Sequence, residues 1–307
     1  MGCRHVWLVG AAIIASPVLV QAQPGIDSER GRALLALAPA KSDTAVFLDV
    51  SALVGGPLAE EWKRQQYERA FPAIAELRSL IGVEPWSLEH ILLVTIPDRR
   101  PSEGAWMLVA REPTGARHEG RAERVVPACG SRASECGWAL ARTREHLLVF
   151  GPEERVRDVV RSPSHDPSWL ELARVREPVW LSSRGDELRD SIRRSSNRLI
   201  SGLGDVDALL ATARFDYEHD VALEVRVSAP DPRHAARLLR LADSVGTFAA
   251  LSAQLGVSSS SVQIFETLRA TRYERDVDLS FTVPYPSFER WLYLSVASGW
   301  SDSGPHP

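Results

Sequence analysis

Tyr217-Glu218-His219-Asp220-Val221 recurs 56 residues later, without a gap, as Tyr273-Glu274-Arg275-Asp276-Val277. Each copy continues into a strand in which apolar and polar residues alternate, so one face is expected to be buried and the other exposed. Shortly after each strand comes a residue that caps helices well, Asp231 in the first copy and Ser287 in the second. Each unit is therefore predicted to be two strands joined by a polar turn, with a helix after them.

The first half of the chain carries weaker versions of the same pattern. Residues 90–96 and 105–111 predict one hairpin, and residues 137–143 and 146–150 predict a second. A helix is expected over 153–161, where Glu153 and Glu154 would offset the exposed N–H groups of its first turn. The sequence therefore predicts an α+β fold of two similar lobes, in which antiparallel hairpins carry helices on one face as repeated ββα units.

Four further elements complete the prediction. The apolar run at residues 44–50 predicts a buried strand, and a strand of similar character is expected at 178–182. Near-helical spacing of apolar residues predicts a helix over 58–81, kinked or divided at Pro72. An amphipathic helix is expected over 186–203, with Leu188 among its inward residues.

The domain organisation follows from changes in composition. Residues 1–22 read as a signal peptide, 23–162 as an N-terminal α+β lobe and 163–297 as a C-terminal α+β lobe that contains the repeat. The boundary is placed at a proline-containing stretch, since such stretches mark linkers. Residues 298–307 are rich in serine, glycine and proline and are expected to be a disordered tail.

The N-terminus indicates export. A short segment with Arg4 precedes an apolar run over 6–20, and Ala22 lies just before the expected cut. The apolar run is too short to be a comfortable membrane span. We therefore expect a periplasmic or cell-envelope protein that is cleaved after Ala22.

Charge argues against nucleic acid as a partner. The 307-residue chain has a formal net charge of −4, so no bulk electrostatic attraction draws it to a polyanion. Only two of its 36 basic residues are lysines, which weakens any argument from arginine-rich patches. One such patch is still a candidate: Arg189, Arg193, Arg194 and Arg198 form a stripe along the expected helix. The stripe is either a contact for an envelope protein or an anionic surface, or simply a solvated helix face.

Cys129 and Cys136 are the two cysteines that remain after removal of the signal peptide. Exported proteins fold in an oxidising compartment, so we expect these two to form a short disulfide loop. A metal or redox pair is the alternative, but the spacing is not CxxC and no histidine pair lies nearby.

Motifs for catalysis and cofactor binding are absent from the sequence. The chain has no G-x-S-x-G or S-x-x-K, no complete glycine-rich phosphate loop and no H-x-x-x-H metal pair. Asp276 and Asp278 share a strand face and could in principle act as paired carboxylates, but a solvated strand start is the preferred interpretation because Asp220 repeats the position of Asp276. Tyr273 is expected to pack against its own hairpin or helix, with stacking on a ligand as the alternative. No catalytic residue, cofactor or metal is therefore assigned.

Leu37 to Leu53 resembles the opening of uncharacterised exported bacterial proteins, in which an "aPadTavflDvsaL" pattern follows the signal peptide. Ile81 to His90 is similar to their "tGfdperDLdrv" stretch, with part of its charge pattern replaced. The resemblance covers roughly residues 34–96. These proteins contain a domain of unknown function, so the resemblance implies export and an α+β fold, and no activity or site residues.

Three functions remain in view, and one of them is a peripheral partner of an outer-membrane or secretion assembly, which the arginine stripe and the aromatic residues suggest. Export, a repeated structural unit and the lack of catalytic motifs favour a non-enzymatic binding or scaffold module of the cell envelope. The alternative is an extracytoplasmic hydrolase that uses carboxylates in a cleft between the lobes.

Overall fold

The computed structural model describes residues 28–39, 42–50, 87–95, 106–113, 126–127, 138–143, 146–163, 172, 175, 177–185, 188–189, 193, 206–216, 220–254 and 265–284. The chain divides into two compact units, with the division between Pro178 and Val179. The signal peptide, the tail and the helix predicted over 58–81 lie outside the described residues. Of the helix predicted over 186–203, the structure describes three positions, all helical: Leu188, Arg189 and Arg193.

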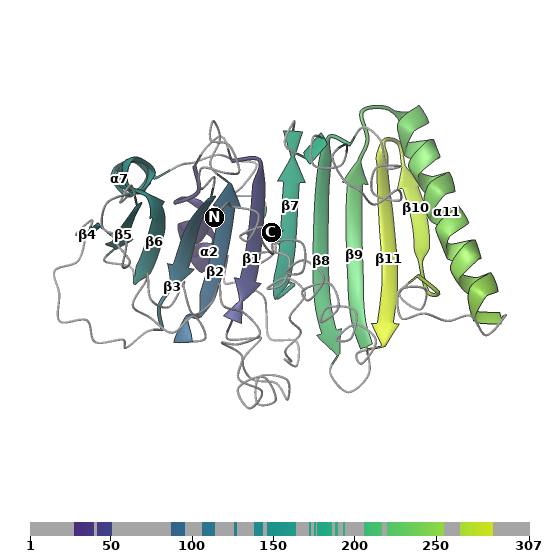
Figure 1. Cartoon of the computed structure of the whole chain (residues 1–307), viewed down its shortest axis with the longest axis horizontal. Helices are drawn as coiled ribbons and strands as arrows, with labels where there is room; N and C mark the ends of the chain where they lie inside the picture. The colour runs from purple at the N-terminus through teal and green to yellow at the C-terminus, as the bar shows by residue number, and fades with distance from the viewer. Residues whose placement is uncertain are drawn as a thin grey trace, which may run out of the picture. The chain divides into compact units, whose positions relative to one another are not determined.

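The N-terminal unit has an antiparallel sheet in the order β1-β2-β3-β6-β5-β4 (Figure 1). Both predicted hairpins are confirmed, as β2 with β3 and β5 with β6. The strands are β1 (Thr44–Asp49), β2 (His90–Thr95), β3 (Trp106–Arg111), β4 (Val126–Pro127), β5 (Trp138–Arg142) and β6 (Leu147–Pro152), and the helices are α2 (Ser28–Leu35) and α7 (Glu153–Arg161). The predicted helix over 153–161 is thus confirmed, and Glu153 in its first turn forms an ion pair with Arg157.

Burial on both faces distinguishes this sheet. All six residues of β6 are buried, and so are the first five of β1. Their near-continuous apolar sequence is what such burial requires. Side-chain hydrogen bonds also join the start of β1 to the end of β2. Ser42 Oγ donates to the carbonyl oxygen of Thr95 at 2.6 Å, and Thr95 Oγ1 accepts from the N–H of Thr44 at 3.1 Å.

The strands of the C-terminal unit are antiparallel and lie in the order β10-β11-β9-β8-β7. Its elements are β7 (Val179–Arg184), β8 (Ala208–Asp216), β9 (Asp220–Ser228), α11 (Pro232–Gln254), β10 (Arg269–Tyr273) and β11 (Asp276–Pro284). The 23-residue helix α11 follows β9, and the chain then returns as the hairpin of β10 and β11 (Figure 1). The strand–strand–helix order predicted for the first copy is therefore present as β8, β9 and α11.

The two strands that open the repeated segments lie next to each other. β9 and β11 pair antiparallel over nine residues each, and Glu224 lies opposite Ser280, which is its own equivalent in the 56-residue repeat. Their burial alternates in nearly the same order, with Val221 and Val227 buried in β9, and Val277 and Val283 buried in β11.

One face of this sheet packs against α11. Val227 and Val277 form a core cluster with Ala235 and Leu238 of the helix. Leu188 lies in the same cluster, which confirms the prediction that it points inward. The opposite face carries the polar residues of β9 and β11. The fold as a whole is mixed α+β and consists mainly of antiparallel sheet.

Candidate functional site

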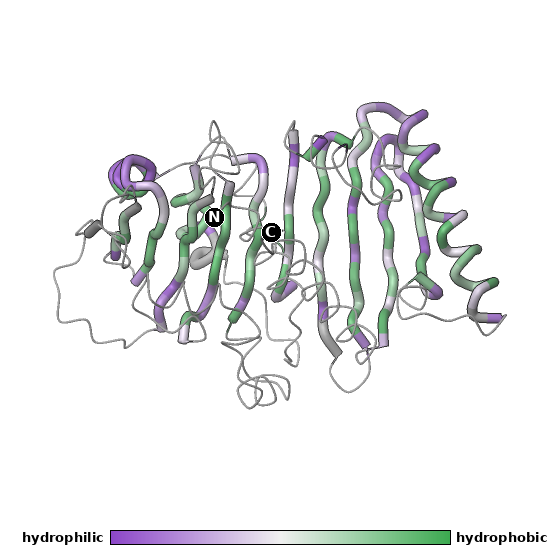
Figure 2. The backbone as a smooth tube through the Cα atoms, viewed as in Figure 1, coloured by the Kyte–Doolittle hydropathy of each residue, from purple (hydrophilic) through white to green (hydrophobic). Residues whose placement is uncertain are grey.

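Charged and polar side chains gather on one face of the strands β9, β10 and β11. We call it the polar face and define it as the outward-pointing residues of β9, β10 and β11: Glu224, Arg226, Arg269, Thr271, Tyr273, Asp276, Asp278 and Ser280. Alternate residues of a strand point to opposite sides, so these residues lie on the side away from Val227 and Val277. Figure 2 shows the resulting alternation of hydrophilic and hydrophobic residues along the strands.

Arg226 and Asp278 form the centre of the polar face. They lie directly opposite each other in the β9–β11 register, which is the closest approach two strand residues can have. Arg226 Nε donates to Asp278 Oδ1 at 2.7 Å, and Nη2 donates to Oδ2 at 3.2 Å. Both carboxylate oxygens of Asp278 are thus engaged by one planar guanidinium group.

Acidic groups surround this guanidinium. The hydrogen bond from Arg226 to Asp278, and then the charge of Asp278, raise the pKa of Arg226 above its ordinary value. Asp276 and Glu224 act more weakly in the same direction, and desolvation opposes them. The centre of the polar face therefore carries both positive and negative charge, with one arginine among three carboxylates.

Tyr273 gives the polar face an aromatic edge. It lies opposite Asp276 in the β10–β11 register, and its side chain is 68% exposed. Most of Tyr273 is therefore uncovered, which differs from the expectation that it packs against its own hairpin or helix. The physical reason is its place on β10, an edge strand of the described sheet, where only β11 supplies side chains beside it on that face.

A second polar cluster lies in the N-terminal unit. Asp49, His90 and Arg111 occupy one row across β1, β2 and β3. His90 Nε2 lies 4.0 Å from Asp49 Oδ2, and the imidazole stacks on Phe47 with ring centroids 5.8 Å apart. A histidine beside a carboxylate has the chemistry of a general base. His90 is only 6% exposed, however, so its surroundings suit a structural role better than contact with a substrate.

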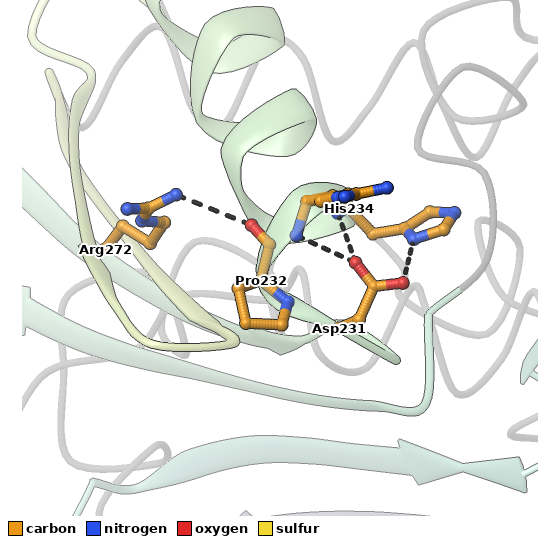
Figure 3. Close-up of polar contacts among 5 residues, drawn as sticks. Asp231, Pro232, His234 and Arg272 are labelled. Carbon is orange, nitrogen blue, oxygen red and sulfur yellow. Dashed lines mark hydrogen bonds and ion pairs between the residues drawn. The ribbon is translucent and has the colours of Figure 1, made fainter.

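A histidine and an aspartate also meet at the start of α11 (Figure 3). Asp231 Oδ1 accepts from the backbone N–H groups of Arg233 at 2.7 Å and His234 at 2.9 Å. Its Oδ2 lies 2.8 Å from His234 Nδ1. The predicted N-cap is thus confirmed, and the bonds from the backbone and then the ring of His234 lower the pKa of Asp231. Arg272 also donates to the carbonyl oxygen of Pro232, at 3.4 Å.

The arginine stripe predicted from the sequence is described at two of its four positions. Arg189 Nη1 donates to Asp207 Oδ1 at 3.0 Å, so this guanidinium belongs to a salt bridge. Arg193 is exposed. Arg194 and Arg198 lie outside the described residues, as do both cysteines of the predicted disulfide, Cys129 and Cys136.

Asp276 and Asp278 do share a face, as the alternation predicts, but they differ in environment. Asp278 is held by Arg226, whereas Asp276 Oδ1 is shielded from solvent and has no hydrogen-bond partner among the described residues. Within the described ranges, no three His, Cys, Asp or Glu side chains are placed to share a metal ion. No helix in those ranges is long and apolar enough to cross a bilayer.

The polar face itself was missed by sequence reasoning. Its signal was present in the spacing of the repeat, because antiparallel pairing of the two alternating strands brings Arg226 to Asp278. That pairing could not be assumed from the sequence, since β10 lies between α11 and β11 in the chain. Comparison with protein-family models, curated proteins and solved structures finds no match for this chain.

Proposed function

We propose that the chain is a non-enzymatic binding or scaffold module of the cell envelope and that the polar face is where it binds a partner protein. The observation that carries this proposal is the exposure of the face. The side chain of Arg226 is 59% exposed, and Tyr273 as a whole residue is 68% exposed. Arginine and tyrosine are the residue types enriched at protein–protein interfaces.

The charge pattern supports a protein as the partner. Arg226 and Arg269 lie among Glu224, Asp276 and Asp278, so neither sign dominates the face. A surface of this kind is complementary to another mosaic of charges, and such complementarity gives specificity and orientation more than affinity. A uniform polyanion or polycation would meet like charges on part of this surface.

The hydrolase alternative would use Asp276 and Asp278 as its carboxylates. The bidentate contact with Arg226 favours a structural role for Asp278, because both of its carboxylate oxygens accept hydrogen bonds from one guanidinium group. A panel of ester, glycoside and peptide substrates discriminates between the two functions. Turnover that is lost in Asp276→Asn would overturn the binding proposal.

Site-specific photocrosslinking in the native envelope tests the polar face directly. A photoreactive residue is introduced at Thr271 or Ser280, both exposed, and in a control chain at Glu154, an exposed residue of α7. We expect a discrete protein adduct from the two polar-face positions and none from Glu154. Charge reversal by Arg226→Glu is expected to remove the adduct, whereas Arg161→Glu leaves it. Equal yields at all three positions would refute the assignment.

Export and the disulfide are part of the same proposal. The signal peptide would be cleaved after Ala22, and Cys129 and Cys136 would be joined in the oxidising compartment. The intact mass of protein recovered from the envelope tests both points. Expected are a chain that starts at Gln23 and a gain of two hydrogens on reduction, and a reduced chain that still begins at Met1 would contradict both.

The finer architecture is also a proposal. We infer that the chain is built from repeated ββα units in two similar lobes, and that it is related to the exported bacterial proteins that its 34–96 region resembles. The matching order of buried residues in β9 and β11 supports the repeat. If β10 and β11 are the strands of a second ββα unit, a helix should begin near Ser287, as backbone chemical shifts would reveal.

A further inference from the structure

The side of α11 that faces away from the sheet is exposed to solvent. Its buried positions, Ala235, Leu238, Ala242 and Ala249, recur at helical spacing and turn toward the sheet. At about 100° per residue, the positions that point the opposite way form a single line along the helix. We call this line the outer stripe and define it as Arg233, Arg237, Arg240, Ser244, Thr247, Phe248 and Leu251, all of which are exposed.

The first half of the outer stripe is basic. Arg233, Arg237 and Arg240 follow one another at intervals of one helical turn. Among the described residues, none of these three guanidinium groups has an ion-pair partner. Asp243 is the only acidic residue of α11, so the helix carries a clear excess of positive charge.

The second half of the outer stripe is apolar. Residues 244–254 contain no charged side chain, and two large apolar residues project from them. Phe248 is 65% exposed and Leu251 is 53% exposed. They lie three residues apart, which places them side by side on the helix surface. Figure 2 shows the change from hydrophilic to hydrophobic along the helix.

We propose that the outer stripe docks on an anionic phospholipid bilayer, with the three arginines at lipid phosphates and with Phe248 and Leu251 in the headgroup–acyl boundary. Charge complementarity selects this occupant, since arginines near a membrane are attracted to anionic lipid headgroups and exposed Phe and Leu side chains can enter the headgroup–acyl boundary. The described part of α11 is about 34 Å long, so both halves can touch one flat surface.

This surface is independent of the polar face. α11 covers the side of the sheet that bears Val227 and Val277, whereas Arg226 and Asp278 lie on the other side. A chain held at a bilayer through α11 would therefore keep the polar face turned away from the lipid. Loss of lipid binding and loss of a protein adduct at Thr271 are consequently separable results.

Vesicle cosedimentation of the full mature chain tests the proposal. The vesicles are phosphatidylethanolamine with phosphatidylglycerol, and pure phosphatidylcholine vesicles are the neutral reference. Each arginine close to an anionic surface strengthens binding about fivefold, so replacing Arg233, Arg237 and Arg240 by glutamine should weaken binding roughly a hundredfold at low salt. The matched control replaces Arg32, Arg161 and Arg214 by glutamine. These arginines are also exposed, and their replacement removes the same amount of charge.

A second variant tests the apolar half. Phe248→Ser with Leu251→Ser leaves the charge unchanged and is expected to weaken binding about tenfold or more, because inserted apolar surface is lost. Circular dichroism at matched temperature confirms that each variant is folded. Equal binding by the arginine variant and its control, or no binding of the parent chain to anionic vesicles at low salt, would overturn the proposal. Binding to phosphatidylcholine at equal strength would also overturn it.

Discussion

Gly151→Ala is the substitution whose effect follows most directly from the geometry. Gly151 lies in β6 opposite Ala139 of β5, and it also borders Met107 of β3, which is completely buried. A Cβ atom built at Gly151 would lie 2.9 Å from Met107 Cγ and 3.3 Å from Met107 Cβ. The first distance is below any normal carbon–carbon contact, so the methionine or the strand must move.

The expected magnitude combines two opposing effects. An extra methyl group in a closely packed core costs about 1–3 kcal/mol. Replacing glycine also reduces the conformational entropy of the unfolded chain, which offsets about 0.4–1 kcal/mol. We therefore expect Gly151→Ala to lower the free energy of unfolding by about 1–2 kcal/mol.

Gly246→Ala is the matched control and should have the opposite sign. Gly246 lies inside α11, where a Cβ would meet nothing closer than the carbonyl oxygen of Leu268 at 3.7 Å and its Cβ at 3.9 Å. Both are ordinary van der Waals distances. Glycine in a helix interior is less favourable than alanine by about 0.5–1 kcal/mol, so the variant should be stabilised by that amount.

Urea unfolding followed by tryptophan fluorescence gives the free energies, and hydrogen exchange with mass spectrometry localises them. The exchange measurement is needed because the chain has two compact units, which can unfold separately. Faster exchange is expected in β3 and β6 of Gly151→Ala, and slower exchange in α11 of Gly246→Ala. The reasoning would be refuted if Gly151→Ala were neutral or stabilising, or if Met107→Ala, which vacates the contact, did not reduce the cost of the new methyl group.

Three further predictions concern exposed positions. Asp231→Asn is expected to flatten the pH dependence of the melting temperature at acidic pH. The lowered pKa of Asp231 contributes stability that is present above the ordinary pKa of a carboxyl group and is lost as pH falls through the lowered folded-state value. A melting temperature that falls with acid as steeply in the variant as in the parent chain would contradict this. A double-mutant cycle with Arg226→Ala and Asp278→Ala should give a coupling of about 0.2–1 kcal/mol that shrinks with added salt, since the pair is exposed, and a salt-independent coupling would count against an ionic contact. Glu274 has a φ of 52° in the turn between β10 and β11, so Glu274→Gly should raise the melting temperature while Glu274→Val lowers it, and the reverse order would be inconsistent with a left-handed turn residue.

Local pattern accounts for the elements that the sequence predicts correctly. Apolar runs place β1 and β6, alternation places β9 and β11, and the acidic first turn places the start of α7. Each of these signals depends on residues close together in the chain. They report which side of an element is buried and where the element begins.

The order of the strands depends on information of another kind. β10 comes before β11 along the chain, yet β9 pairs with β11. The helix α11 separates β9 from the β10–β11 hairpin in sequence, so the second strand of that hairpin can lie beside β9. The contact of Arg226 with Asp278 and the exposure of Tyr273 both follow from that order. The local sequence around an aromatic residue does not distinguish a central strand from an edge strand. The exposure of Tyr273 could therefore not be derived from its sequence neighbours.

The pairing of Glu224 with Ser280 has a consequence for how such a chain can arise. An interface in which a residue meets its own equivalent is isologous, the kind that two identical subunits form about a two-fold axis. The seam between β9 and β11 thus has the geometry of a homodimer contact contained within one polypeptide. If the 56-residue repeat is a duplication, a shorter ancestor with a single ββα unit could have formed the same seam with a second molecule, and fusion of two copies would then have made that dimer permanent.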